Sequence, residues 1–66
     1  MKWTHLTINT FKEMYDSHIN GKTILIAHPA FYEWKYEFYN GDTIILEIMI
    51  KSNNYYYMIL DEPNLK

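Results

Sequence analysis

Glu33 and Glu47 are the two side chains whose predicted positions, opposite each other on neighbouring strands, could support acid–base chemistry. Two carboxylates held close together raise the pKa of one of them, and glycosidases use such a pair as acid and base. Those enzymes also need a cleft that distorts a sugar, and a flat sheet face in a chain of 66 residues offers none. We therefore predict no catalytic residues and expect that the chain is not an enzyme.

The histidines and glycines do not have the spacing of a known ligand site. His5, His18 and His28 lack the close spacing of zinc ligands and fall in three different predicted elements. Gly21 and Gly41 are isolated, so the chain has no glycine-rich loop for a phosphate. Because the sequence contains no cysteine, it forms neither a disulfide nor a thiolate metal site. We expect no metal and no cofactor.

The charge balance argues against nucleic acid and membranes as partners. Six lysines and eight acidic residues give a net charge of −2, and there is no arginine, the usual ligand of phosphate and guanine. The lysines are dispersed, so they form no footprint for a phosphate backbone. No apolar run is long enough to span a bilayer, and no leader segment opens the chain. We therefore expect a cytoplasmic location.

The pattern of apolar residues predicts one helix followed by four strands. Residues 7–20 have apolar side chains at three- and four-residue spacing, with Thr7 as the N-cap and Gly21 as the left-handed residue at the end. From residue 23 the period changes to two, which predicts strands at 23–28, 31–39, 43–51 and 55–60.

These elements predict an α+β fold in which one N-terminal helix packs on a four-stranded antiparallel β-meander. The fold has two layers, and one face of the sheet stays open. We expect a single domain over residues 1–62 and a short polar tail at 63–66, and residues 1–6 leave room for a further edge strand.

Alternation along the strands divides the predicted sheet into two faces. Bulged three-residue loops at 39–41 and 52–54 bring the large aromatic side chains of the second strand onto the same face as the aliphatic side chains of the third. On strand 23–28 we favour Ile24 and Ile26 as the inward pair. The rest of the predicted core comprises Tyr32, Trp34, Tyr36, Phe38, Ile44, Leu46, Ile48, Ile50, Tyr56, Met58 and Leu60.

The face that the helix does not cover is the predicted site for a partner. It places Glu33 opposite Glu47, a like-charge pair that costs about 0.2–1 kcal/mol. An apolar and locally acidic face suits a partner that brings apolar groups and a cation. The predicted contact residues are Phe31, Glu33, Glu37, Ile45, Glu47, Met49, Tyr55, Tyr57 and Ile59.

The sequence therefore predicts a non-enzymatic protein-binding module that acts by stoichiometric contact. Abundant residues with A/T-rich codons, small size and an acidic balance are typical of inhibitors that phages and mobile elements direct against host nucleic-acid-handling or defence proteins. The basic surface of such a host protein would attract the glutamates. Two alternatives stay open: a small homodimeric structural or regulatory domain that uses the same face, and a binder of a nucleotide or other small aromatic ligand.

Overall fold

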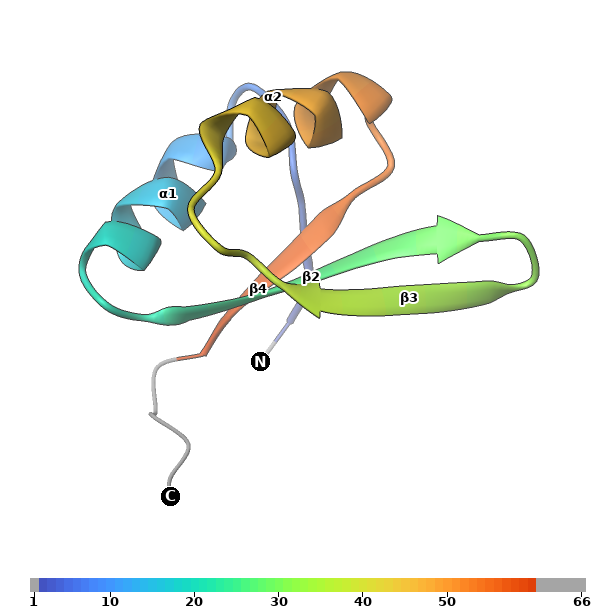
Figure 1. Cartoon of the computed structure of the whole chain (residues 1–66), viewed down its shortest axis with the longest axis horizontal. Helices are drawn as coiled ribbons and strands as arrows, with labels where there is room; N and C mark the ends of the chain where they lie inside the picture. Colours follow the sequence, from blue (N-terminus) through green and yellow to red (C-terminus); the bar gives the residue numbers. More distant parts are fainter. Residues whose placement is uncertain (1, 61–66) are drawn as a thin grey trace.

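Residues 2–60, which a computed structural model describes, form four strands and two helices (Figure 1). The predicted α+β class is confirmed. The predicted polar tail at 63–66 lies outside the described residues. The elements, in chain order, are β1 (Thr4–His5), α1 (Phe11–Ile19), β2 (Thr23–Ala30), β3 (Glu33–Phe38), α2 (Thr43–Ser52) and β4 (Tyr56–Leu60).

The order of strands in the sheet is β1-β4-β2-β3, so the predicted meander is wrong. All three pairings are antiparallel. As a consequence β1 runs parallel to β2 on the far side of β4, and β3 runs parallel to β4 on the far side of β2. Parallel strands need a crossover connection rather than a tight hairpin. The helices α1 and α2 are these two crossovers, and both lie on the same face of the sheet (Figure 1).

Residues 43–51 were predicted as a strand and instead form most of α2. The carboxylate of Asp42 caps this helix, because its Oδ1 accepts hydrogen bonds from two backbone N–H groups of the first turn at 2.9 and 3.2 Å. Asn53 ends the helix in the left-handed conformation, with φ 61°. Glu47 and Lys51 lie one turn apart, with 3.5 Å between Oε2 and Nζ. These local signals and the need for a crossover outweigh the strand preference of the isoleucines.

A helix is present in the predicted region, but it is not N-terminal, because β1 precedes it, and it begins one turn later than predicted. Residues 8–10 form a turn, in which the hydroxyl of Thr7 accepts from the backbone N–H of Asn9 at 3.1 Å and so does not cap a helix. The predicted left-handed glycine at the far end is confirmed, because Gly21 has φ 92°. Thr4–His5 supplies the further edge strand that the sequence left open.

The core fills the space between the two helices and one face of the sheet. Ile24 and Ile26 point into it with 1% of their surface exposed each, which confirms the inward pair predicted for this strand. The helices contribute Met14 from α1 and Leu46 and Met49 from α2. The buried cluster consists of Leu6, Met14, Ile24, Ile26, Tyr39, Leu46, Met49 and Tyr57.

Tyr57 is the largest fully buried side chain of this core, and its hydroxyl has hydrogen-bond partners. Only 1% of the residue is exposed. Its hydroxyl donates to Glu13 Oε1 at 2.8 Å and lies 3.2 Å from the carbonyl oxygen of Thr10, at the start of α1. Burial and the neighbouring Glu13 carboxylate raise the pKa of Tyr57 to about 12. The contact ties β4 to α1 through a neutral phenol.

Candidate functional site

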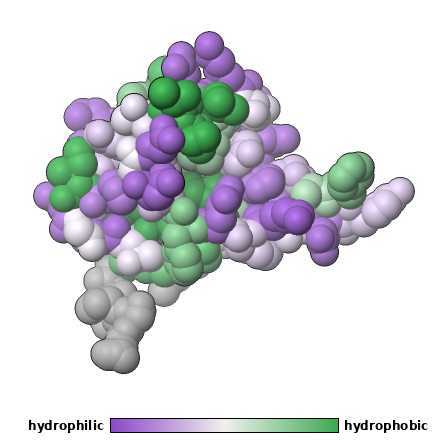
Figure 2. All heavy atoms as spheres, viewed as in Figure 1, coloured by the Kyte–Doolittle hydropathy of each residue, from purple (hydrophilic) through white to green (hydrophobic). Residues whose placement is uncertain are grey.

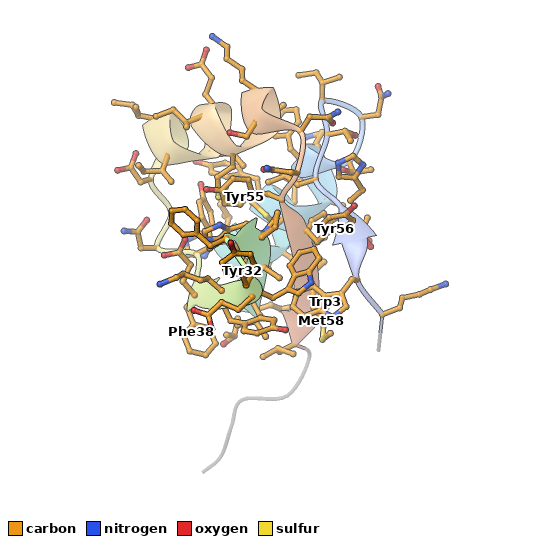
Figure 3. All side chains as sticks on the ribbon, turned by 90° about the vertical axis from the view of Figure 1, so that its right-hand side faces the viewer. Trp3, Tyr32, Phe38, Tyr55, Tyr56 and Met58 are labelled. Carbon is orange, nitrogen blue, oxygen red and sulfur yellow. The ribbon has the colours of Figure 1, made fainter. Side chains whose placement is uncertain are left out.

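The sheet face that points away from both helices is made mostly of aromatic and apolar side chains. In Figure 3, Phe38 and Met58 lie on this side of the sheet, and Tyr55 lies on the side of α2. In the described part of the strands, the register places no Lys, Asp or Glu here. We call this surface the open face; it comprises Trp3, His5, Thr23, Leu25, Ala27, Pro29, Trp34, Tyr36, Phe38, Tyr56, Met58 and Leu60.

The open face carries side chains that the sequence had assigned to the core. Trp34, Tyr36 and Phe38 are 50%, 60% and 67% exposed, so their predicted burial is wrong. Tyr56, Met58 and Leu60 are half-buried on the same face. Alternation correctly placed these residues on one face. The helices, however, pack against Ile24, Ile26 and Tyr57 and so cover the opposite face.

Other predicted core residues are divided between two places. Leu46 is buried, and Ile50 packs against the core. Ile44 and Ile48 are 69% and 54% exposed, because α2 turns them outwards, and Tyr32 lies fully exposed in the turn between β2 and β3.

The contact residues predicted on the strands share one face, but that face is the covered one. Tyr57 and Ile59 point towards the helices, and Ile59 packs against the core. Glu33 and Glu37 lie on the same side of β3 and are exposed. Tyr55, just before β4, stacks on His28 with 4.7 Å between the ring centroids. The predicted placement on an open face is therefore wrong for Tyr57 and Ile59, whereas Glu33 and Glu37 lie on the same side of the sheet but remain exposed.

The predicted contact residues in 43–51 lie on α2, so their side chains do not share one face as they would on the predicted strand. Met49 is 3% exposed and buried in the core, whereas Ile45 is 44% exposed on the outside of α2. Glu47 pairs with Lys51 on the helix, so the expected cross-strand pair with Glu33 does not form.

Four aromatic side chains surround a hollow in the middle of the open face. Ala27 lies opposite Tyr36 on one side and Tyr56 on the other, and its small side chain forms the floor. Trp3 approaches Tyr36 with 6.0 Å between ring centroids, and Trp34 meets Tyr56 edge-on at 5.8 Å. The volume is about 380 Å³, within the range of small-molecule pockets. We call it the aromatic hollow.

The hairpin of β2 and β3 extends the open face beyond the rest of the sheet (Figure 1). β4 pairs with β2 only as far as Ala27, whereas β3 pairs with it as far as Ala30. β2 continues through Pro29, beyond its predicted end at residue 28, and the turn to β3 lies at Phe31 and Tyr32.

Both residues of this turn are aromatic and fully exposed. Phe31 has φ 54°, a conformation that two-residue hairpins usually give to glycine, asparagine or aspartate, and that costs a bulky residue about 1–3 kcal/mol. Neither ring is covered by the rest of the chain in the described residues. An exposed aromatic pair at a strained tip indicates a contact surface, and we include this hairpin tip in the candidate site.

A second apolar surface lies on α2, where Ile44, Ile45 and Ile48 are exposed. Figure 2 shows hydrophobic atoms gathered at the top of the molecule, where Figure 1 places α2. Beside this surface, a groove of about 460 Å³ runs between the two helices, lined by Phe11, Leu46 and other mostly apolar side chains. The exposed apolar side chains of α2 are aliphatic, whereas the groove also contains the rings of Phe11 and Tyr15.

Sequence reasoning missed Trp3, Ala27 and the exposed role of Trp34. The available signal was Ala27, a small residue among larger ones on strand 23–28.

Over residues 2–60, no helix is long and apolar enough to cross a membrane. The same residues contain no cluster of three histidine or acidic side chains arranged for a metal ion. No protein-family model, curated protein or solved structure matches the chain.

Proposed function

We propose that the chain is a non-enzymatic binding module that contacts a protein partner in fixed stoichiometry through the open face and the hairpin tip. The observation that carries the proposal is the exposure of Trp34, Tyr36 and Phe38 side by side on one strand. A few residues supply most of the binding energy at protein interfaces, and Trp and Tyr are enriched among them. Contiguous apolar patches of this kind are uncommon on monomeric proteins and mark interaction sites.

The partner is expected to present an apolar surface at the centre of the contact. Glu33, Glu37 and Glu47, whose charge motivated a basic partner, lie away from the open face. An uncharged aromatic face loses little hydration free energy on burial and gains most against apolar groups. The proposal therefore replaces a basic host surface by an apolar one.

Trp34→Ala and Glu33→Ala form a matched pair that tests the proposal, because the two neighbours point to opposite faces of β3. The tagged wild type and both variants are used to capture proteins from bacterial lysates, since the A/T-rich coding bias predicts a bacterial, phage or plasmid origin. We expect a protein that is captured by the wild type and Glu33→Ala and lost with Trp34→Ala, and that then forms a complex of defined stoichiometry when purified. Capture that is equal for all three chains, or lost with Glu33→Ala alone, would contradict the proposal.

A second candidate function is the binding of a flat aromatic ligand, and the aromatic hollow is the observation that favours it. Rings of Trp3, Trp34, Tyr36 and Tyr56 offer faces and edges on which a base or indole could stack. Titration with adenosine and with indole, followed by NMR, tests this function. Saturable shifts at the hollow that disappear in Ala27→Val but persist in Ala30→Val support it, and the absence of shifts in the wild type rejects it.

A further inference from the structure

The outer edge of β3 is long and uncovered. β3 has six residues, all of them exposed, and lies at the end of the sheet, whereas β1 at the other end has two. β3 contains no proline, and its register with β2 is continuous from Glu33 to Phe38, so no bulge interrupts it. Natural proteins usually protect such an edge, because it can pair with another strand.

The backbone groups that point outwards belong to the three aromatic residues. The N–H of Tyr39 donates to the carbonyl oxygen of Ile24 at 3.0 Å, which shows that Tyr39 turns its backbone groups towards β2. In an antiparallel pair this direction alternates from residue to residue. The backbone N–H and C=O groups of Trp34, Tyr36 and Phe38 therefore point away from the sheet.

The side chains on the other face of β3 are charged and alternate in sign, in the order Glu33, Lys35, Glu37. When two copies of β3 pair antiparallel around Tyr36, Lys35 of each copy faces Glu37 of the other. Pairing around Lys35 would place Lys35 opposite Lys35 and Glu33 opposite Glu37. Pairing around Glu37 would place Glu37 opposite Glu37. Charge complementarity excludes these two registers, because opposed like charges destabilise strand pairs. Pairing around Trp34 would also oppose Glu33 and Lys35, but Phe38 would then face residue 30, before the partner's β3 begins. The register centred on Tyr36 is the one that combines opposite charges with pairing along the whole strand.

From this edge we infer that two copies of the chain associate by antiparallel β3–β3 pairing centred on Tyr36. In this register all outward backbone groups find partners, since Tyr36 exchanges hydrogen bonds with Tyr36 of the second copy, and Trp34 exchanges them with Phe38. The result is a continuous eight-stranded sheet with a two-fold axis perpendicular to it. Both open faces lie on the same side and stay uncovered, so the inference does not depend on the proposed function.

Charge reversal tests the register. In Lys35→Glu the introduced carboxylate of each copy lies opposite Glu37 of the other, and in Glu37→Lys two ammonium groups oppose each other, so each variant should weaken the dimer about tenfold or more. The double variant Lys35→Glu/Glu37→Lys restores opposite charges and should restore the dimer. An equimolar mixture of the two single variants should form a heterodimer. Glu33→Lys is the matched control, because residue 33 faces Tyr39 in this register.

Analytical ultracentrifugation over a concentration series reads out these variants, with circular dichroism to confirm that each is folded. A wild type that stays monomeric at millimolar concentration would overturn the inference. So would a dimer that responds to Glu33→Lys as strongly as to Glu37→Lys, or a double variant that remains as weak as the single ones.

A disulfide provides a second, independent test, because the chain has no cysteine of its own. In the proposed register, residue 36 of each copy faces its own counterpart at a Cα spacing of about 5.5 Å, which a disulfide can bridge. Two residues 38 lie about four positions apart along the strands, or about 13 Å. Mild oxidation should therefore cross-link Tyr36→Cys and leave Phe38→Cys monomeric on a denaturing gel. The opposite pattern, or equal cross-linking of both, would contradict the register.

Discussion

The two faces of this sheet are formed by neighbouring residues of the same strands, yet one face is buried under the helices and the other is exposed. On β4, Tyr57 is buried against α1, and the adjacent Tyr56 lies on the open face between His5 and Trp34. On the covered face, helix α1 provides Glu13 as the hydrogen-bond acceptor for the buried hydroxyl of Tyr57. The comparison shows that an aromatic residue type does not decide which face is core. The helices and the polar partners that they bring decide it.

The open face is also richer in large aromatic side chains than the covered face. A sheet that only needed a core would place its tryptophans and most of its tyrosines under the helices. Here Trp34, Tyr36 and Phe38 are exposed, and Ile24 and Ile26 are buried. This inversion indicates that the aromatic residues serve contact with another molecule more than the stability of the monomer.

Alanine substitution of one tyrosine on each face should give the largest contrast. Tyr57→Ala removes a buried ring and should cost about 3–5 kcal/mol of unfolding free energy, enough to unfold most of a small domain. Tyr36→Ala makes the same chemical change on the open face, where 60% of the residue is exposed, and should cost at most about 1 kcal/mol. Chemical denaturation measures both. A larger loss for Tyr36→Ala would mean that the faces are exchanged.

A similar contrast exists within α2. Met49→Ala should cost about 2–5 kcal/mol because the side chain is buried, whereas Ile48→Ala, one residue earlier and exposed, should change stability by about 0.5 kcal/mol. If 43–51 were the strand that the sequence predicted, the order would be reversed. Thermal unfolding followed by circular dichroism distinguishes the two results.

Tyr57→Phe isolates the hydrogen bond to Glu13 from the packing of the ring. Its loss should cost about 1.5–3 kcal/mol, because the acceptor is charged. The ring stays in place, so the variant should remain folded at neutral pH. A loss near zero in chemical denaturation would show that the contact contributes nothing to stability.

The same residue makes stability depend on alkaline pH. The pKa of Tyr57 is raised from 10.0 to about 12 in the folded state, so folding favours the neutral phenol. This contribution is complete below pH 10 and is lost as the pH rises through 12. Burial also raises the pKa of Tyr39, which adds in the same direction. Unfolding measured across this range should show a shallower decline in Tyr57→Phe than in the wild type.

Asp42→Ala should cost about 1 kcal/mol of unfolding free energy through loss of the α2 cap. Asp42→Asn is the control, because asparagine caps a helix nearly as well and should keep most of the stability. Equal and negligible effects of both substitutions would argue that the chain after Asp42 is not helical.

The sequence was sufficient for the elements whose local and tertiary signals agree. The period of 3.6 predicted α1, the period of two predicted β2, β3 and β4, and Gly21 marked the end of the helix correctly. Alternation also grouped Trp34 with Tyr36 and Phe38, and Tyr56 with Met58, as the structure does.

The segment 43–51 could not be assigned in the same way because its signals conflict. Its isoleucines alternate and favour a strand, whereas Asp42, Asn53 and the Glu47–Lys51 pair favour a helix. The incorrect strand order resulted from the assignment of 43–51 to a strand. The incorrect choice of the face that the helices cover resulted from it as well, since alternation defines two faces without saying which one is covered.

Solvent access to Trp34 tests the central claim most directly. In Trp3→Phe, Trp34 is the only tryptophan, and its fluorescence reports on the open face alone. The measurement is made at concentrations low enough to keep the chain monomeric. We predict that the emission wavelength of Trp34 lies near that of a solvated indole and that acrylamide quenches the emission efficiently. Denaturant should shift the emission wavelength only slightly, because the side chain is already half exposed in the folded chain. Blue-shifted emission that acrylamide cannot quench until the chain is unfolded would contradict the account, because Trp34 would then lie in the core.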